Sequence, residues 1–249
     1  MKKSILVLGA SGGIGEAVVK EFADCGYEIF ATCNNGSLKE IKQYCANKNV
    51  VMHELFMDIE NYESIEKAFK QTFGKADYLE SVINCTGVSL GERLLCDESI
   101  DNIEKIINVN LKGAILISRE AMKYFITIKR GSIVNISSIY GIYGGACESV
   151  YSSTKGGIIA LTKALAQECG SFNVRVNCVA PGCIETKMTD CYLTEEGRQS
   201  LIAATPLNRI GRPEDVAKAV KFLASDQSSF ITGECLTVSG GATNFNFCH

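Results

Sequence analysis

The chain has 249 residues, of which 46% are hydrophobic, and its formal net charge is -3. This length and composition are enough to bury one sizeable core, so we expect a single domain over residues 1–249. The slightly acidic balance excludes the basic footprint of a nucleic-acid-binding protein. No apolar run approaches the ~18 residues that a membrane span needs.

Short β-branched runs alternate with longer helical patterns along the chain. Continuous apolar runs predict strands at 4–9, 27–32, 50–57, 79–85, 131–138, 174–182 and 233–241. Apolar residues at helical spacing predict helices at 14–26, 37–47, 62–74, about 98–128, 150–170 and 212–225. This alternation predicts an α/β fold, a doubly wound Rossmann-type parallel sheet of about seven strands with helices on both faces.

The least regular segment covers about residues 183–211, between the sixth strand and the last helix. Open α/β sheets bind ligands beyond the carboxyl ends of their strands. This segment is therefore either a substrate lid or a plain surface loop with a short helix.

The twelve cysteines form no C-x-x-C pair, and the chain has only two histidines, His53 and His249. Zinc binding by a Cys/His cluster is therefore unsupported, and we predict no metal site. The amino-terminal apolar run stops at Gly9, which is too short for a signal peptide. We interpret most cysteines as small apolar residues in a reducing cytoplasm.

A glycine cluster lies between the first strand and the first helix, in the stretch "LGASGGIGEAV". Its glycines let the backbone turn sharply and approach a pyrophosphate, while the helix amino terminus offers free N–H groups. At this place in an alternating chain, the cluster predicts a dinucleotide site. The residues assigned to that site are Gly9, Ser11, Gly12, Gly13, Ile14 and Gly15.

The end of the second strand bears on the choice of cofactor, and it reads "ATCNNGS". An acid there would bind the ribose hydroxyl of NAD, and a basic residue would accommodate the 2′-phosphate of NADP. The chain has neither. Neutral donors such as Asn34 and Ser37 can bind a phosphate, so we favour NADP, with NAD as the alternative.

Two tyrosines precede a lysine by four residues, in the pairs Tyr44–Lys48 and Tyr151–Lys155. Such residues share a helix face, so the spacing alone identifies no site. The first pair ends a polar helix and is interpreted as solvated surface. Tyr151 follows a strand that ends "NISSIYG", so it is expected beside Ser138 at the carboxyl edge of the sheet.

Asn110 is a polar residue in the otherwise apolar helical run "IINVNLKG". A buried Asn needs hydrogen-bond partners. It is therefore either satisfied by backbone groups or marks a bend or a water site that reaches the same crevice. A serine hydrolase is excluded, because neither histidine lies at a plausible strand edge.

Several of these motifs together resemble the short-chain dehydrogenase/reductase family, in order and spacing along essentially the whole chain. They are the glycine stretch 9–15, "NCTG" at 84–87, Asn110, Ser138, Tyr151-x-x-x-Lys155 and "APG" at 180–182. Stretches such as "VRVNCVAPGCIET" are similar to the subgroup of bacterial 3-oxoacyl-[acyl-carrier-protein] reductases. The resemblance implies NADPH-dependent reduction of a 3-oxoacyl thioester, on acyl carrier protein or coenzyme A, in fatty acid biosynthesis. It also implies a cytoplasmic homotetramer.

The resemblance further implies a role for each catalytic residue. Tyr151 would be the general acid, and Lys155 would lower its pKa and bind the nicotinamide ribose. Ser138 would align the substrate oxygen, and Asn110 would hold a water that replenishes the proton. The other cofactor contacts that it implies are Asp58, Ile59, Asn84, Gly87, Pro181, Gly182, Ile184 and Thr186.

The chain departs from the subgroup at positions that bear on its ligands. Gly12 stands where the subgroup has a basic residue. Lys129 and Arg130 could dock an acidic carrier protein, but the second expected basic position falls on Phe172. A sugar, sterol or small ketone is therefore an alternative substrate. A non-catalytic dinucleotide-binding regulator is an alternative function.

Overall fold

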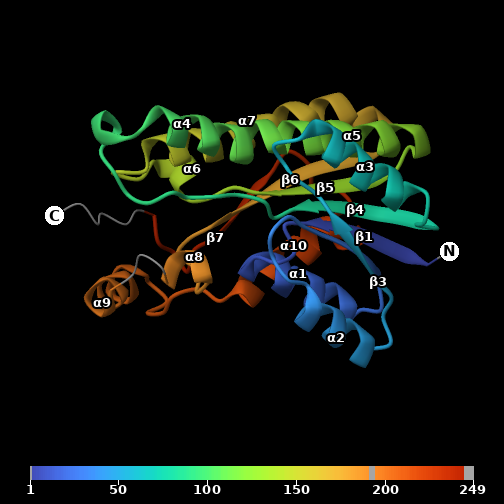
Figure 1. The fold of residues 1–249 in the computed structure, drawn as a ribbon, viewed down its shortest axis with the longest axis horizontal. Helices are drawn as coiled ribbons and strands as arrows, with labels where there is room; N and C mark the ends of the chain where they lie inside the picture. The colour runs from blue at the N-terminus through green and yellow to red at the C-terminus, as the bar shows by residue number, and fades with distance from the viewer. Residues whose placement is uncertain (1, 191–193, 244–249) are drawn as a thin grey trace.

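The computed structural model describes residues 2–190 and 194–243. Seven strands form one parallel sheet in the order β3-β2-β1-β4-β5-β6-β7, which confirms the predicted α/β fold (Figure 1). The strands are β1 (Lys3–Leu8), β2 (Glu28–Cys33), β3 (Met52–Phe56), β4 (Tyr78–Asn84), β5 (Gly131–Ile136), β6 (Val174–Pro181) and β7 (Cys235–Val238). The order reverses between β1 and β4, which creates a switch point where ligands bind in such sheets.

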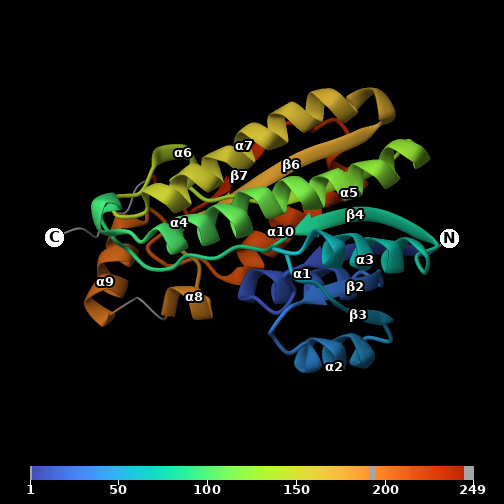
Figure 2. The same cartoon turned by 45° about the horizontal axis from the view of Figure 1, so that its top comes forward.

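Helices cover both faces of the sheet (Figures 1 and 2). One face carries α1 (Gly13–Ala23), α2 (Lys39–Asn47) and α10 (Pro213–Ala224). The other carries α3 (Tyr62–Phe73), α5 (Gly113–Ile128) and α7 (Ser149–Cys169). The remaining α-helices are short: α4 (Ile100–Ile106), α6 (Tyr140–Tyr143), α8 (Lys187–Asp190) and α9 (Glu195–Ala204).

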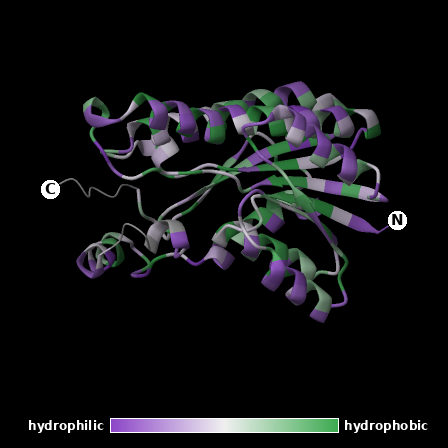
Figure 3. Ribbon diagram, viewed as in Figure 1, coloured by the Kyte–Doolittle hydropathy of each residue, from purple (hydrophilic) through white to green (hydrophobic). Residues whose placement is uncertain are grey.

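The core has two layers because successive side chains of a strand point to opposite faces. In β1, Ile5 and Val7 pack toward α1 and α10, whereas Leu6 and Leu8 pack toward α3 and α5. Figure 3 shows hydrophobic residues concentrated in the strands and hydrophilic ones on the outer sides of the helices. Burial on both faces explains the continuous apolar runs of the sequence.

The helix predicted over 98–128 is not one continuous α-helix. It consists of α4, a π-helical segment η2 (Ile107–Lys112) and α5. Asn110 lies inside the π-helical segment, where the two amide atoms of its side chain bond the backbone of Val88. Short π segments often mark functional sites. The alternative in which Asn110 is satisfied by backbone groups is confirmed, and the bend or water site stays a prediction.

The irregular segment 183–211 contains α8 and α9, which lie beyond the carboxyl ends of the strands (Figure 1). Leu201 of α9 is buried against Ile139, Ile210 and Ala242. The segment is therefore more than a plain loop. The strand predicted over 233–241 is too long, because Gly240 and Gly241 turn with positive φ angles of 65° and 89° after β7 ends.

Seven of the cysteines that the structure describes are buried in the hydrophobic clusters or packed against them, in agreement with the sequence interpretation of most of them. Cys45, Cys169 and Cys178 are buried thiols, but Cys25 and Cys96 are exposed and Cys147 is disulfide-bonded. Within the described ranges, no helix is long and apolar enough to cross a membrane. No group of three or more His, Cys, Asp or Glu side chains in the same ranges could hold a metal ion.

Substitution of Phe125 tests the packing of α5 against the sheet. The Phe125 side chain is fully buried, and the absence of a Cβ at Gly131 makes room for its ring. Phe125→Ala should lower the free energy of unfolding by about 3–5 kcal/mol, measured by urea denaturation, because it leaves a cavity. Ile128→Ala, on an exposed position of the same helix, is the control. A loss below about 1 kcal/mol for Phe125→Ala would contradict this packing.

Candidate active site

A cavity of about 170 Å³ opens at the carboxyl edge of the sheet. It brings together most of the residues predicted to act on substrate or nicotinamide. Those lining it are Ile14, Gly87, Ser138, Tyr151, Lys155, Pro181, Gly182, Ile184 and Thr186. The sequence motifs therefore converge in space, although they are spread over most of the chain.

Tyr151 and its neighbours come from two elements that meet at this cavity. Tyr151 lies in the first turn of α7, and Ser138 follows β5 and hydrogen-bonds the phenol. The Ser138 hydroxyl oxygen also accepts the N–H of Tyr140 at 3.1 Å, which fixes the serine. Lys155 lies one turn further along α7, with its Nζ 5.5 Å from the centre of the Tyr151 ring.

Lys155 is buried and held from the sheet side. Its Nζ donates a hydrogen bond of 2.9 Å to the carbonyl of Ile136 at the end of β5. A Cβ at Gly87 would lie 3.2 Å from this nitrogen, so only glycine leaves the amine its full space. Gly87 therefore acts through the room it gives to Lys155.

The electrostatics of the pair differ from the expectation. Burial raises the pKa of the Tyr151 phenol above its ordinary value, the nearby Glu148 raises it further, and the hydrogen bond from Ser138 lowers it. Burial also lowers the pKa of Lys155 to about 8. The expected depression of the phenol's pKa by Lys155 is therefore not found in the protein alone, where burial is the largest influence on the pKa of both groups.

Asn110 holds the loop that follows β4. Its Oδ1 accepts the N–H of Val88 at 2.8 Å, and its Nδ2 donates to the Val88 carbonyl at 2.9 Å. A longer bond of 3.4 Å reaches the hydroxyl of Thr154 on α7. Both amide atoms of its side chain therefore bond the protein, and the implied water-holding role of Asn110 stays a prediction.

The glycine cluster has the shape that a pyrophosphate needs. Gly9 has a φ of +74°, and a Cβ there would lie 3.0 Å from the backbone nitrogen of Thr86. A Cβ at Gly15 would lie 2.2 Å from the Gly9 carbonyl oxygen. No side chain caps α1 at Gly12, so its first N–H groups are available to an anion. The residues present therefore fit a dinucleotide.

Two further contacts close this cradle. The side chain of Thr186 approaches Gly13 so closely that a Cβ there would lie 2.9 Å from the Thr186 methyl carbon. On the other side, a Cβ at Gly36 would lie 2.3 Å from the Ser11 hydroxyl oxygen. The loop that contains the exposed Asn34 therefore lies beside the glycine cluster.

Three other residues that were predicted to contact the cofactor make contacts with other residues of the protein. Asp58 accepts the N–H of Glu60 at 3.1 Å in the loop before α3, the helix that Asn61 caps. Asn84 is buried and bonds Asn135 and Thr86. Ile59 packs at Gly113, where a Cβ would lie 2.5 Å from its side chain. None of Asp58, Ile59 or Asn84 lines the cavity.

Sequence reasoning missed several residues that line the cavity. They are Cys85, Thr86, Ser137, Cys183, Ile136 and Thr189. The first four adjoin predicted residues, so their places in the motifs were a usable signal. Thr189 offered none, because it lies in the irregular segment, where its hydroxyl donates to the Ile184 carbonyl at 2.6 Å.

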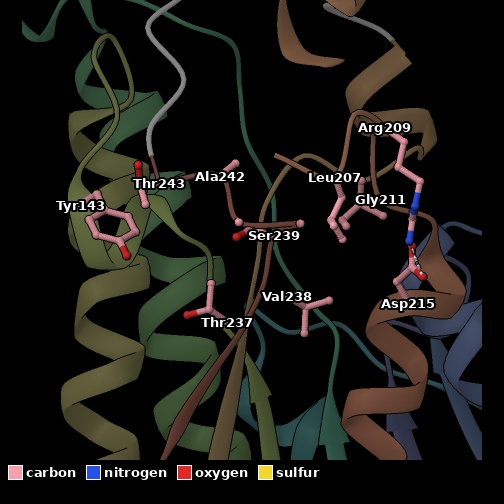
Figure 4. Close-up of a pocket in the computed structure, with 13 residues that line it drawn as sticks. Tyr143, Leu207, Arg209, Gly211, Asp215, Thr237, Val238, Ser239, Ala242 and Thr243 are labelled. Carbon is pink, nitrogen blue, oxygen red and sulfur yellow. Dashed lines mark hydrogen bonds and ion pairs between the residues drawn. The ribbon is translucent and has the colours of Figure 1, made fainter. Parts of the chain in front are cut away.

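Figure 4 shows a larger cavity, of about 520 Å³, and Ile184 lines both cavities. None of the predicted catalytic residues lines it. Its two charged side chains, Arg209 and Asp215, neutralise each other through two hydrogen bonds of 2.6 and 3.0 Å. The chemistry therefore belongs to the smaller cavity.

The pair Tyr44–Lys48 and the basic residues Lys129 and Arg130 all lie outside the site. The Tyr44 hydroxyl donates to Asp24 at the surface, and Lys48 pairs with the same carboxylate, so the pair Tyr44–Lys48 is not part of the site. Lys129 ends α5 and Arg130 precedes β5, whereas Ser138 follows β5. Both basic residues therefore lie at the opposite edge of the sheet from Tyr151.

The lowered pKa of Lys155 predicts a specific pH dependence of stability. Below about pH 8 the buried ammonium is charged, and its desolvation destabilises the fold in full. Between about pH 8 and 10.5 the folded protein binds fewer protons than the unfolded chain, so wild-type stability gains with rising pH.

Lys155→Met removes the cost of desolvating the ammonium, and an apolar side chain often replaces a buried charge at no loss of stability. We expect it to exceed wild type by about 1–2 kcal/mol near pH 7, with the advantage shrinking above pH 8, in chemical denaturation over that range. Lys163→Met, on an exposed position of the same helix, is the control. An advantage that grows with pH would contradict the buried ammonium.

Comparison with known proteins agrees with this geometry. A family model described as enoyl-(acyl carrier protein) reductase matches residues 9–243. The chain is 39% identical over 241 residues to the 3-oxoacyl-[acyl-carrier-protein] reductase of Aquifex aeolicus, covering 96% of each chain. It is 34% identical to the protein of the same name from Thermotoga maritima, covering 96% and 97%.

Solved structures show the same relationship. ElxO with NADP bound superposes with a TM-score of 0.91 at 31% identity, covering 97% of this chain and 98% of that one. The 3-oxoacyl-[acyl-carrier protein] reductase of Brucella melitensis superposes with a TM-score of 0.86 at 29% identity, covering 97% and 91%. The fold, the Tyr151–Lys155 site and these matches along nearly the whole chain establish that this protein belongs to the short-chain dehydrogenase/reductase family.

Proposed function

We propose that this protein reduces the ketone of a 3-oxoacyl thioester to the 3-hydroxyacyl form with NADPH, as a step of fatty acid biosynthesis. The observation that carries the proposal is the meeting of Ser138, Tyr151 and Lys155 in one cavity beside a glycine-rich dinucleotide cradle. Full-length relatives named 3-oxoacyl-[acyl-carrier-protein] reductase support the substrate class.

The cradle determines how the cofactor would be held. The N–H groups at the start of α1 would bind the pyrophosphate, and residues 181–186 with Lys155 would surround the nicotinamide ribose. When bound, the reduced nicotinamide supplies the hydride. Every other part of the reaction falls to side chains of this chain.

Proton transfer falls to Tyr151. Burial raises the pKa of its phenol, so the group carries its proton at neutral pH and can give it to the substrate oxygen. The Ser138 hydroxyl, fixed by its contact with Tyr140, orients that oxygen. The pKa of Lys155 is lowered to about 8, which leaves it mostly charged at pH 7. Its ammonium therefore stabilises the phenolate as it forms.

The choice of NADPH rests on the loop after β2. This loop has no acid to repel a 2′-phosphate, and it exposes the neutral donors Asn34 and Ser37 close to Ser11. ElxO, which superposes closely, was solved with NADP bound. NAD would lack the usual acidic partner for its ribose hydroxyl.

The assembly around the site is part of the same proposal. We infer a single catalytic domain over residues 1–249, with α8 and α9 as a substrate lid, in a cytoplasmic homotetramer. Ile100, Ile107 and Ile115 are exposed along α4, η2 and α5, and they give this side of the molecule an apolar surface that a second copy would cover. Lys129 and Arg130 are the basic residues available to a carrier protein.

Tyr151→Phe removes only the hydroxyl that would donate the proton. It should lower kcat for ketone-dependent NADPH oxidation by about 10²–10⁴-fold while NADPH still binds. The assay uses an acetoacetyl thioester, with NADPH binding followed by fluorescence. Tyr44→Phe is a matched control, because it alters the other tyrosine that precedes a lysine by four residues, which bonds Asp24 at the surface.

The same assay separates substrate classes and cofactors. Thioesters of coenzyme A and of acyl carrier protein are compared under NADPH and NADH. Unchanged turnover by Tyr151→Phe would refute the proposed proton donor. Turnover of other ketones but of neither thioester would refute the substrate.

A further inference from the structure

The carboxyl group of Glu148 lies beside the proposed proton donor and has no part in the mechanism so far. Glu148 precedes α7 by one residue, and its carbonyl accepts the N–H of Ser152 at 2.8 Å, which starts that helix. Glu148 and Tyr151 also line the same small pocket at the start of α7. The carboxyl group therefore occupies a defined position relative to the phenol.

A second element fixes this carboxyl group. The hydroxyl of Ser89, in the loop after β4, donates a hydrogen bond of 2.9 Å to Glu148 Oε1. In the same region, the backbone N–H of Arg93 donates to the carbonyl of Cys147 at 2.8 Å. The loop after β4 is thus attached to the start of α7 at two points, one of which is the Glu148 side chain.

The surroundings of Glu148 are acidic rather than basic. Glu92 and Glu98 are the nearby carboxylates, and the phenols of Tyr140 and Tyr151 face the same region. Arg93 lies 3.5 Å from Glu98 and so pairs with that residue. Within residues 2–190 and 194–243, no cation forms an ion pair with Glu148.

These surroundings place the ionisation of Glu148 in the neutral range. Burial raises the pKa of its carboxyl to about 7, the hydrogen bond from Ser89 opposes this rise, and the charges of Glu92 and Glu98 add to it. A negative charge on Glu148 in turn raises the pKa of the Tyr151 phenol. The cation of Lys155 lies 5.5 Å from the centre of that ring.

We propose that Glu148 is a positioning residue for the Tyr151 proton: its carboxylate, held by Ser89, keeps the proton on the phenol and so sets the upper pH limit of ketone reduction. The proposal rests on the proposed function of Tyr151 as the proton donor. Above pH 7 the charged carboxylate makes the phenol a weaker acid, but it preserves the protonated form that reduction requires. Beside the ionisation of Lys155 at about pH 8, the pH profile of kcat/KM should therefore show one ionisation near neutrality, from Glu148, and one in alkaline solution, from Tyr151.

Glu148→Gln tests this directly, because the amide oxygen can still accept the Ser89 hydroxyl but cannot become charged. The step near neutrality should disappear, and the alkaline limit of reduction should move down by roughly 0.5–1 pH unit. Glu104→Gln removes an exposed carboxylate of α4 and is the control. Its profile should superimpose on that of wild type.

Two further variants shift the pKa of the Glu148 carboxyl and leave Glu148 itself in place. Ser89→Ala removes the donor that stabilises the carboxylate, so the neutral step should move to higher pH. Glu92→Gln removes a neighbouring like charge, so the same step should move to lower pH. Opposite shifts are expected of electrostatic coupling and are not expected of general loss of packing. They also keep the proposal testable if Glu148→Gln folds poorly, which thermal melting and NADPH binding would reveal.

A Glu148→Gln profile identical to that of wild type would overturn the inference, as would shifts of the same sign in the other two variants. Either result would leave the proposed function intact. Conversely, full activity of Tyr151→Phe would refute the proposed function itself, whatever the Glu148 variants show.

Discussion

The site depends on the burial of a phenol and an amine together at the end of a parallel sheet. Lys155 is buried and Tyr151 is partly buried, and burial favours the neutral form of each group: the pKa of the phenol rises and that of the amine falls to about 8. A protonated phenol is what ketone reduction needs. The cavity thus prepares the acid by desolvation, and the ammonium acts mainly when negative charge develops on the phenol.

Small residues and hydrogen-bonded polar side chains around the site maintain this burial. Gly87 leaves space for the Lys155 amine, and the π-helical segment turns Asn110 toward the loop that carries Gly87. Gly9 and Gly15 let α1 approach the ends of β1 and β4. The same edge of the sheet therefore holds both the dinucleotide cradle and the proton donor, which is the arrangement that hydride transfer requires.

The sequence was sufficient for the sheet, and its motifs include Ser138, Tyr151 and Lys155, which line one cavity; their catalytic roles stay predictions. Buried parallel strands are continuous apolar runs, and Ser138, Tyr151 and Lys155 lie at strand and helix ends that the alternation predicts. It failed where distant segments decide the outcome. Asn110, in the π-helical segment, bonds the backbone of the distant Val88, and the pKa of the phenol depends on burial and on Glu148. The spacing of residues in the sequence shows neither how deeply a side chain is buried nor which charge lies beside it.

The most direct test of this account is the titration of Tyr151 itself in the protein without cofactor. Tyrosinate formation is followed by ultraviolet difference absorbance, and the signal that wild type has and Tyr151→Phe lacks belongs to this residue. The account predicts that Tyr151 ionises above the ordinary tyrosine value of about 10. Ionisation of Tyr151 well below that value in the free protein would show that attraction to Lys155 outweighs burial, and would contradict the account.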